Sequence, residues 1–328
     1  MTKSFKWSAI YLASLTALVV ARLIFGFINL SDNLSGWLFS TVMQCGFMGL
    51  MPFVMYAAIK PKPTVKFSRA VGLGMPDIVV ILLSVVAGAL MFLVNIVVSS
   101  LSNAVWTAVG YTSVNSSGVI YSGVEVFILE AVTGSLMPAV FEEITHRGVL
   151  REALDEMGVG SFGKVMIMAL FFGLGHQNIT QFIPTFVVGI VISALAVGTG
   201  SLIPGMIIHF MNNFLITLTN FSLQWGLPFQ YVYALLTNLM FTSNLTLALS
   251  LVGGLAVIGA LVYEINRIER YRKRARERRE SGYPCNYDVC ANGEGAKRAD
   301  LGSVLMLVIG LLVTAGGTVF TLVWGLAR

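Results

Sequence analysis

The stretch IVVILLSVVAGALMFLVNIVVSS, residues 78–100, decides the fold class because it contains no charged side chain. A transmembrane helix needs about 20 consecutive apolar residues to cross the hydrocarbon core of a membrane. The composition agrees, since 56% of the 328 residues are hydrophobic and only 11% are charged, whereas soluble domains carry about 25% charged residues. The sequence therefore predicts a polytopic integral membrane protein with no large soluble domain.

Further apolar runs are long enough to span the membrane. They lie at residues 7–29, 37–59, 124–152, 163–180, 181–199, 202–220, 245–265 and 303–325. Segment 226–243 is apolar but shorter and broken, so we interpret it as an interfacial or re-entrant stretch. We therefore expect an all-α transmembrane helix bundle of about eight or nine spans. The predicted parts of the chain are a transmembrane helical bundle over 1–265, whose candidate functional core is about 124–220, a basic loop over 266–300 and a C-terminal transmembrane helix over 301–328.

Lysine and arginine are unevenly distributed among the connections. Segments 60–76 and 266–300 are rich in them, whereas 30–36, 101–123 and 221–244 contain none. Because cytoplasmic loops are enriched in Lys and Arg, we expect a multi-pass protein of the cell membrane with a cytosolic N-terminus and a cytosolic basic loop. The net charge of +5 thus indicates orientation and contact with membrane lipid, and not nucleic acid. The basic loop could also bind anionic headgroups.

The chain has three cysteines. Cys45 lies inside an apolar run, and we interpret it as a small buried hydrophobic residue. Cys285 and Cys290 lie in the basic loop without a histidine nearby, which is a weak pattern for a metal site. We expect these two to be reduced thiols on the cytosolic side.

Ionisable side chains mark the functional hypothesis, because such groups are rare and costly inside a membrane. They are concentrated in three runs. These are FEEITHRG at 141–148, FGLGH at 172–176 and HFMNN at 209–213. All three histidines of the chain lie in these runs. Counted from the cytosolic ends of their spans, Glu142, His176 and His209 share one layer of the membrane, so we expect them to converge on one cavity.

Helical spacing indicates which of these side chains meet. Glu143 and Arg147 are four residues apart and can pair along one helix face. Glu142 lies about 100° further round the helix and can face a different neighbour. His209 and Asn213 are also four apart, so they present two polar groups in one direction.

This ordered trio of motifs resembles the CAAX protease and bacteriocin-processing family of intramembrane endopeptidases, which includes Abi and type II CAAX prenyl endopeptidase-like proteins. The motifs are E-E-x-x-x-R at Glu142-Glu143…Arg147, F-x-x-x-H at Phe172…His176 and H-x-x-x-N at His209…Asn213. The match covers roughly residues 124–220, which we therefore expect to form the intramembrane protease core. The resemblance implies proteolysis of a peptide or a membrane-anchored protein. Prenylated C-terminal peptides, bacteriocin leaders and other anchored segments all remain possible substrates.

Peptide hydrolysis needs an activated water and stabilisation of the oxyanion that forms. We expect Glu142 to be the general base and His176 to hold the same water. His209 and Asn213 would donate hydrogen bonds to the oxyanion. No Ser or Cys sits beside these groups in the sequence, which argues against a covalent nucleophile.

The requirement for a metal stays open at this point. Glu142, His176 and His209 could bind zinc, with a water in the fourth position. The motif H-E-x-x-H is absent, and we favour a metal-free mechanism with no cofactor.

Other polar residues of the spans have supporting roles in this hypothesis. We expect Glu143 and Arg147 to form a structural ion pair that fixes the helix carrying the general base. His146 lies outside the family pattern, and we interpret it as a structural group. Asn212 would contribute to helix packing. Arg22, in the first span, either snorkels outward or faces the bundle interior.

Two functions of other classes compete with the protease. A transporter or channel would use the same polar groups as a proton or ion relay, although the chain lacks the internal repeat common in transporters. A catalytically idle scaffold or bacteriocin-immunity protein would keep the fold and bind a partner.

Overall fold

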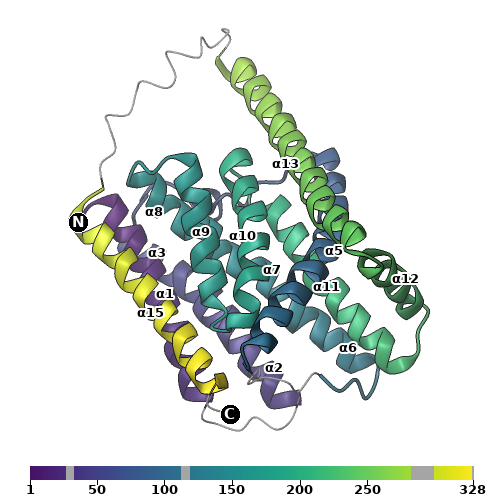
Figure 1. Cartoon of the computed structure of the whole chain (residues 1–328). Helices are drawn as coiled ribbons and strands as arrows, with labels where there is room; N and C mark the ends of the chain where they lie inside the picture. The colour runs from purple at the N-terminus through teal and green to yellow at the C-terminus, as the bar shows by residue number, and fades with distance from the viewer. Residues whose placement is uncertain (27–32, 112–118, 282–298, 327–328) are drawn as a thin grey trace.

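The computed structural model describes residues 1–26, 33–111, 119–281 and 299–326, and every regular element within them is a helix (Figure 1). The first part of the chain forms α1 (Lys3–Gly26), α2 (Asn33–Thr41), the π-helix η1 (Val42–Leu50), α3 (Met51–Ile59), α4 (Phe67–Val71) and α5 (Ile78–Ala108). One long, bent span follows as α6 (Val124–Glu130), η2 (Ala131–Leu136), α7 (Met137–Glu143), η3 (Ile144–Val149) and α8 (Leu150–Glu156). The remaining helices are α9 (Ser161–Gly175), α10 (Ile179–Thr199), α11 (Ile203–Trp225), α12 (Phe229–Phe241), α13 (Asn244–Ser281) and α15 (Leu301–Leu326).

The described residues contain 7 helical stretches long and apolar enough to cross a membrane. They are Lys3–Ile24, Gly36–Ile59, Ile78–Ala108, Val124–Glu156, Ile179–Thr199, Asn244–Arg276 and Leu301–Trp324. α9 is apolar but has only 15 residues, and α11, although 23 residues long, is not among the 7. The all-α polytopic bundle is confirmed, whereas the predicted count of eight or nine spans is not.

The structure corrects the boundary predicted between the bundle and the basic loop 266–300. α13 continues as one helix to Ser281, so the first part of that segment is helical. Arg, Lys and Glu favour helix, and pairs of opposite charge three residues apart add support. Two such pairs lie on this extension, Glu264–Arg267 and Glu269–Arg272. Residues 282–298, which include Cys285 and Cys290, lie outside the described residues.

The connections fall into two groups at opposite ends of the bundle. At one end Lys6 Nζ donates to the Lys60 carbonyl at 3.4 Å, and Arg272 Nε lies 3.6 Å from Asp77 Oδ2. At the other end the Gln224 side chain donates at 2.8 Å to a backbone carbonyl of the segment before α6. In Figure 1 the end of α13 lies at the top and the C-terminus at the bottom. The N-terminus, the lysine-rich segment after α3 and the end of α13 therefore lie at the same end of the bundle.

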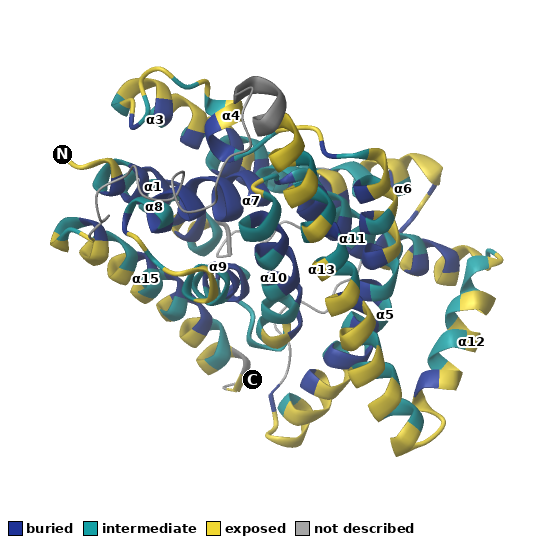
Figure 2. Cartoon of the chain, turned by 90° about the horizontal axis from the view of Figure 1, so that it is seen from above, coloured by how far each residue is buried: buried dark blue, intermediate teal, exposed yellow. Residues whose placement is uncertain are grey.

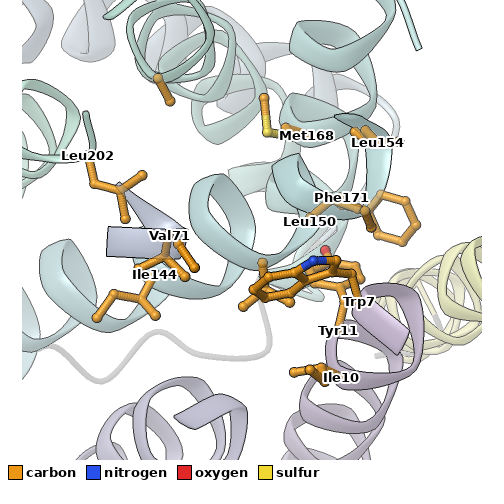
Figure 3. Packing of buried hydrophobic residues seen from close by; sticks show 14 of the residues in the cluster. Trp7, Ile10, Tyr11, Val71, Ile144, Leu150, Leu154, Met168, Phe171 and Leu202 are labelled. Atoms are coloured by element: carbon orange, nitrogen blue, oxygen red, sulfur yellow. The ribbon is translucent and has the colours of Figure 1, made fainter. Parts of the chain in front are cut away.

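A buried cluster fastens α1 to the helices that carry the site (Figure 3). Trp7 and Tyr11 of α1, Leu150 and Leu154 of α8, and Phe171 of α9 belong to it, and each is at most 3% exposed. The rings of Tyr11 and Phe171 meet edge to face with centroids 5.3 Å apart. Because lipid is as apolar as these side chains, close packing holds such helices together in a membrane.

Burial is concentrated in the centre of the bundle. Figure 2 shows buried residues on α7, α8 and the facing sides of α10 and α11, while α12 and the outer side of α13 are largely exposed. Both glutamates of α7 are buried, as is His209 of α11. The bundle therefore surrounds the candidate site on several sides.

Candidate active site

The two candidate glutamates lie on a short α-helix between wider helical turns. α7 is flanked by the π-helices η2 and η3, and a third π-helix, η1, packs against it. In a π-helix the backbone hydrogen bonds join residues i and i+5. Such helices occur mostly as single turns within α-helices, frequently at functional sites. Such turns change the direction of the side chains that follow, so the α-helical spacing of the sequence does not fully predict where these groups point.

Glu142 faces the second span of the chain. Its Oε1 accepts a hydrogen bond of 2.7 Å from Gln44 Nε2 of η1, and the residue is 6% exposed. Its Oε2 is also buried but has no hydrogen-bonding partner among the residues that the structure describes. A buried polar atom without a partner is costly. This oxygen is therefore the one that can accept a hydrogen bond or a proton from a reactant.

Glu143 faces the opposite side, toward α10 and α11. Its Oε1 accepts from Arg147 Nη1 at 2.9 Å and lies 3.0 Å from His209 Nδ1. Arg147 also donates to Ser193 Oγ at 3.2 Å and to the Gly189 carbonyl at 3.4 Å. Glu143 and Arg147 are 1% and 0% exposed. The adjacent glutamates thus have different neighbours, as their angular separation on a helix predicts.

The contact with Glu143 fixes which nitrogen of His209 carries a proton. An ionised carboxylate oxygen only accepts hydrogen bonds, so His209 Nδ1 donates. A neutral His209 then presents a lone pair at Nε2, whereas a protonated His209 donates through Nε2 as well. His209 can therefore act as a hydrogen-bond donor to a reactant only in its protonated form, with Glu143 and Arg147 as its charged neighbours.

His176 follows the last residue of α9. Its Nδ1 lies 2.9 Å from the carbonyl oxygen of Phe172. Since a carbonyl oxygen accepts and does not donate, Nδ1 carries the proton and Nε2 has the free lone pair of the neutral ring. Gln177, the next residue, has a φ of 52°, in the left-handed region that non-glycine residues rarely adopt. The helix therefore ends in a tight turn at His176.

The ring of Phe172 is the centre of the site. Its centroid lies 5.6, 5.0 and 5.4 Å from the ring centroids of His146, His176 and His209, each meeting it edge to face. The guanidinium carbon of Arg147 lies 4.1 Å from the same centroid. All three histidines of the chain, carried by three different helical segments, are thus brought together around one ring, although the shared depth concerned only His176 and His209 among them.

A chain of amides leads to Asn213. Asn95 Nδ2 of α5 donates to Asn212 Oδ1 at 3.1 Å, and Asn212 Nδ2 donates to Asn213 Oδ1 at 3.1 Å. The direction of this chain assigns the oxygen of Asn213 as an acceptor and leaves its NH₂ group as the donor for a reactant. Asn212, predicted to contribute only to packing, therefore also orients Asn213.

Two side chains of α1 reach the same region. The Tyr11 hydroxyl shares a hydrogen bond of 3.0 Å with His146 Nδ1, which gives His146 a structural partner. Arg22 Nη1 donates to the carbonyl oxygen of Gly175 at 2.6 Å. Of the two orientations predicted for Arg22, the structure has the one facing the bundle interior.

Gln44 and Asn95 were not predicted as site residues, although the sequence distinguishes both of them. Each is the single amide side chain within a predicted span, Gln44 in 37–59 and Asn95 in 78–100. The search selected ionisable groups because of their cost in a membrane, whereas neutral amides in apolar runs need partners for the same reason. No comparable feature of the sequence distinguishes Ser193 or Tyr11 as a site residue.

The described residues contain no group of three or more His, Cys, Asp or Glu side chains arranged to hold a metal ion. Glu142, His176 and His209, the alternative zinc ligands, are all described and do not form such a group. Because His209 Nδ1 contacts Glu143, only its Nε2 could bind a metal, and such a carboxylate partner is also usual for a metal-bound histidine. Among the described residues these three side chains are therefore not preassembled as a metal site.

A cavity of about 910 Å³ borders the helix that carries the two glutamates, next to Phe141 and Ile144. It is lined by apolar side chains such as Phe53, Phe141 and Ile144, with Lys60 and Lys66 also on its wall. Phe141 precedes Glu142 in the chain, but none of the candidate catalytic side chains lines this space. The cavity is thus adjacent to the candidate site and separate from it.

Comparison with known proteins agrees with the motifs. Residues 124–215 match the family described as type II CAAX prenyl endopeptidase Rce1-like. No curated protein and no solved structure matches the chain. The matched region contains Glu142, His176, His209 and Asn213 but neither α1, α5 nor α15. Over residues 124–215 the chain is therefore similar to the CAAX protease and bacteriocin-processing family, the resemblance that its motifs indicate.

Proposed function

We propose that the protein is an intramembrane endopeptidase that hydrolyses a peptide bond of a membrane-associated substrate with a water activated by Glu142 and His176. The gathering of all three histidines around Phe172, next to a buried Glu142 with one unpartnered oxygen among the described residues, is the observation that supports it. A buried carboxylate and imidazoles held at one place are typical of general acid–base chemistry.

In this mechanism Glu142 Oε2 takes a proton from the water while His176 Nε2 accepts the water's second hydrogen bond. The hydroxide attacks the carbonyl carbon, and the oxyanion accepts hydrogen bonds from the Asn213 amide and from protonated His209. Glu142 then gives its proton to the leaving nitrogen, and the carbon–nitrogen bond breaks. The products are a carboxylic acid and an amine, and no covalent enzyme intermediate forms.

We expect Asn213→Ala to lower kcat by about 10²–10³ with little change in KM, because an oxyanion donor acts mainly in the transition state. Steady-state cleavage of a labelled peptide by purified protein measures both constants. Asn220→Ala is a matched control, since Asn220 lies on the same helix but is exposed. A higher KM at unchanged kcat would assign Asn213 to substrate binding instead.

We expect the enzyme to keep full activity after dialysis against EDTA, with well under one metal ion per chain by elemental analysis. The physical reason is that a glutamate-activated water needs no metal. Restoration of a lost activity by stoichiometric zinc would contradict this mechanism and would make Glu142, His176 and His209 ligands. A peptidase with a known zinc requirement, carried through the same dialysis, shows that the stripping worked.

We also propose that the lysine-rich end of the bundle is cytosolic, which follows from the enrichment of Lys and Arg in cytoplasmic loops. Cys285 and Cys290 should then react with a membrane-impermeant thiol reagent only when the cytosolic face is exposed. A variant with both cysteines replaced by serine is the control for labelling of Cys45. Labelling of Cys285 or Cys290 in intact cells would reverse the orientation.

A further inference from the structure

The turn that carries His176 is held by side chains of two distant helices. Residues 174–177 form the end of α9 and the start of the turn to α10, and three of their carbonyl oxygens accept hydrogen bonds from α1 and α15. These bonds run from Arg22 Nη1 to Gly175 O (2.6 Å), from Thr318 Oγ1 to Leu174 O (3.3 Å) and from Thr321 Oγ1 to Gln177 O (2.6 Å).

Leu174 O also accepts from Gln177 N at 3.0 Å, within the turn itself. The other two carbonyls need donors from elsewhere, because the last carbonyls of a helix have no partner within it and Gln177 lies outside both helices. Inside a membrane there is no bulk water to replace them. α15 also approaches the turn closely at Gly317, where an added Cβ would lie 2.7 Å from Gln177 Nε2. Gln177 in turn has the left-handed backbone conformation. Contacts from α1 and α15 therefore help to fix the conformation of the turn, in addition to its own sequence.

The two supporting helices are fastened to each other. α1 and α15 lie side by side along their length (Figure 1). At the end remote from the turn, Asp300 Oδ2 accepts hydrogen bonds of 2.6 Å each from Thr2 Oγ1 and Ser4 Oγ. Although partial burial opposes it, these bonds and those from Ser303 lower the pKa of Asp300, so the carboxylate stays ionised. The two helices thus form one unit.

We propose that α1 and α15 act as a clamp that positions His176 for catalysis, with Arg22, Thr318 and Thr321 as its positioning residues. The proposal rests on the proposed endopeptidase function. His176 Nδ1 is fixed by Phe172 O within α9, so the path of the turn sets the direction of Nε2. Both clamp helices lie outside the family match at residues 124–215, so this chain would complete its catalytic centre with helices that the match does not include.

The test compares hydroxyl-deleted and hydroxyl-retaining variants of α15. The double variant Thr318→Val/Thr321→Val keeps the side-chain shape and removes both hydrogen bonds to the turn. We expect kcat to fall by about 10–10²-fold with KM unchanged, because small misplacements of a catalytic group have effects of that size. Thr318→Ser/Thr321→Ser should restore kcat. Thr314→Val is the matched control, since its hydroxyl bonds only to carbonyls of its own helix, at 3.0 and 3.1 Å.

Hydrogen exchange of the full-length protein gives a second readout. The backbone amides at 174–178 should exchange faster in the double valine variant than in wild type or in Thr314→Val. Equal kcat in the double valine variant and Thr314→Val would overturn the clamp while the endopeptidase stands. If neither wild type nor Glu142→Gln cleaves the peptide, the proposed function is overturned, and the clamp's catalytic role with it.

Discussion

Glu142→Gln is expected to abolish peptide cleavage in a protein that still folds. The amide keeps an oxygen that can accept the hydrogen bond from Gln44, 2.7 Å away in wild type, so the packing of α7 against η1 is retained. It cannot take a proton from water, and loss of a general base typically costs about 10²–10⁴ in rate. Cleavage of labelled peptides and the melting temperature of the purified variant measure the two expectations separately.

Glu130→Gln is the matched control for this variant. Glu130 lies on the same long span, two helical segments earlier, and its Oε2 accepts from Trp37 Nε1 at 3.1 Å. It should leave cleavage unchanged. Comparative mass spectrometry of membranes containing wild type or Glu142→Gln extends the test to natural substrates. An unchanged peptide pattern and an unchanged strain phenotype would favour a scaffold or immunity role.

The helices were largely predictable from the sequence because long apolar runs have few alternatives in a membrane. Residues 78–100 predicted the core of α5, which extends to Ala108. The π-helices η1, η2 and η3 were not predictable, because runs of apolar side chains do not distinguish hydrogen bonds to i+4 from those to i+5. The end of α13 at Ser281 was missed for a different reason. The sequence of its last turns is rich in charged residues, and a prediction based on apolar runs does not extend a span into such a segment.

The site was partly predictable, to the extent that it depends on spacing within one helix. Glu143 and Arg147 pair as their separation of four residues predicts. The partnership of Glu143 with His209 was not expected, because it joins two helices whose relative rotation the sequence does not specify. The same holds for the support of the His176 turn by Thr318 and Thr321.

The buried ion pair between Glu143 and Arg147 is expected to contribute strongly to stability. Glu143→Ala and Arg147→Ala should each lower the free energy of unfolding by about 3–5 kcal/mol, because removing one member of a buried ion pair leaves the other charge uncompensated. Glu264 and Arg267 provide the control, since this Glu–Arg pair also lies within one helix but is 36% and 52% exposed in its side chains. Glu264→Ala should cost only about 0–1 kcal/mol. Thermal or denaturant unfolding in detergent measures these differences.

The two core variants should not be equal. When Arg147 is removed, His209 Nδ1 still donates to Glu143 at 3.0 Å, which partly satisfies the carboxylate. When Glu143 is removed, the direct contacts of Arg147 are the Ser193 hydroxyl, the Gly189 carbonyl and the face of Phe172, all uncharged. The carboxylate of Glu142 then acts on Arg147 only at a distance, without a hydrogen bond. Glu143→Ala should therefore unfold more easily than Arg147→Ala. Because the paired residues are in contact, the double variant should cost less than the sum of the single ones. If instead Glu142→Gln were the destabilised variant and Glu143→Ala merely slow, the roles of the two glutamates would be exchanged.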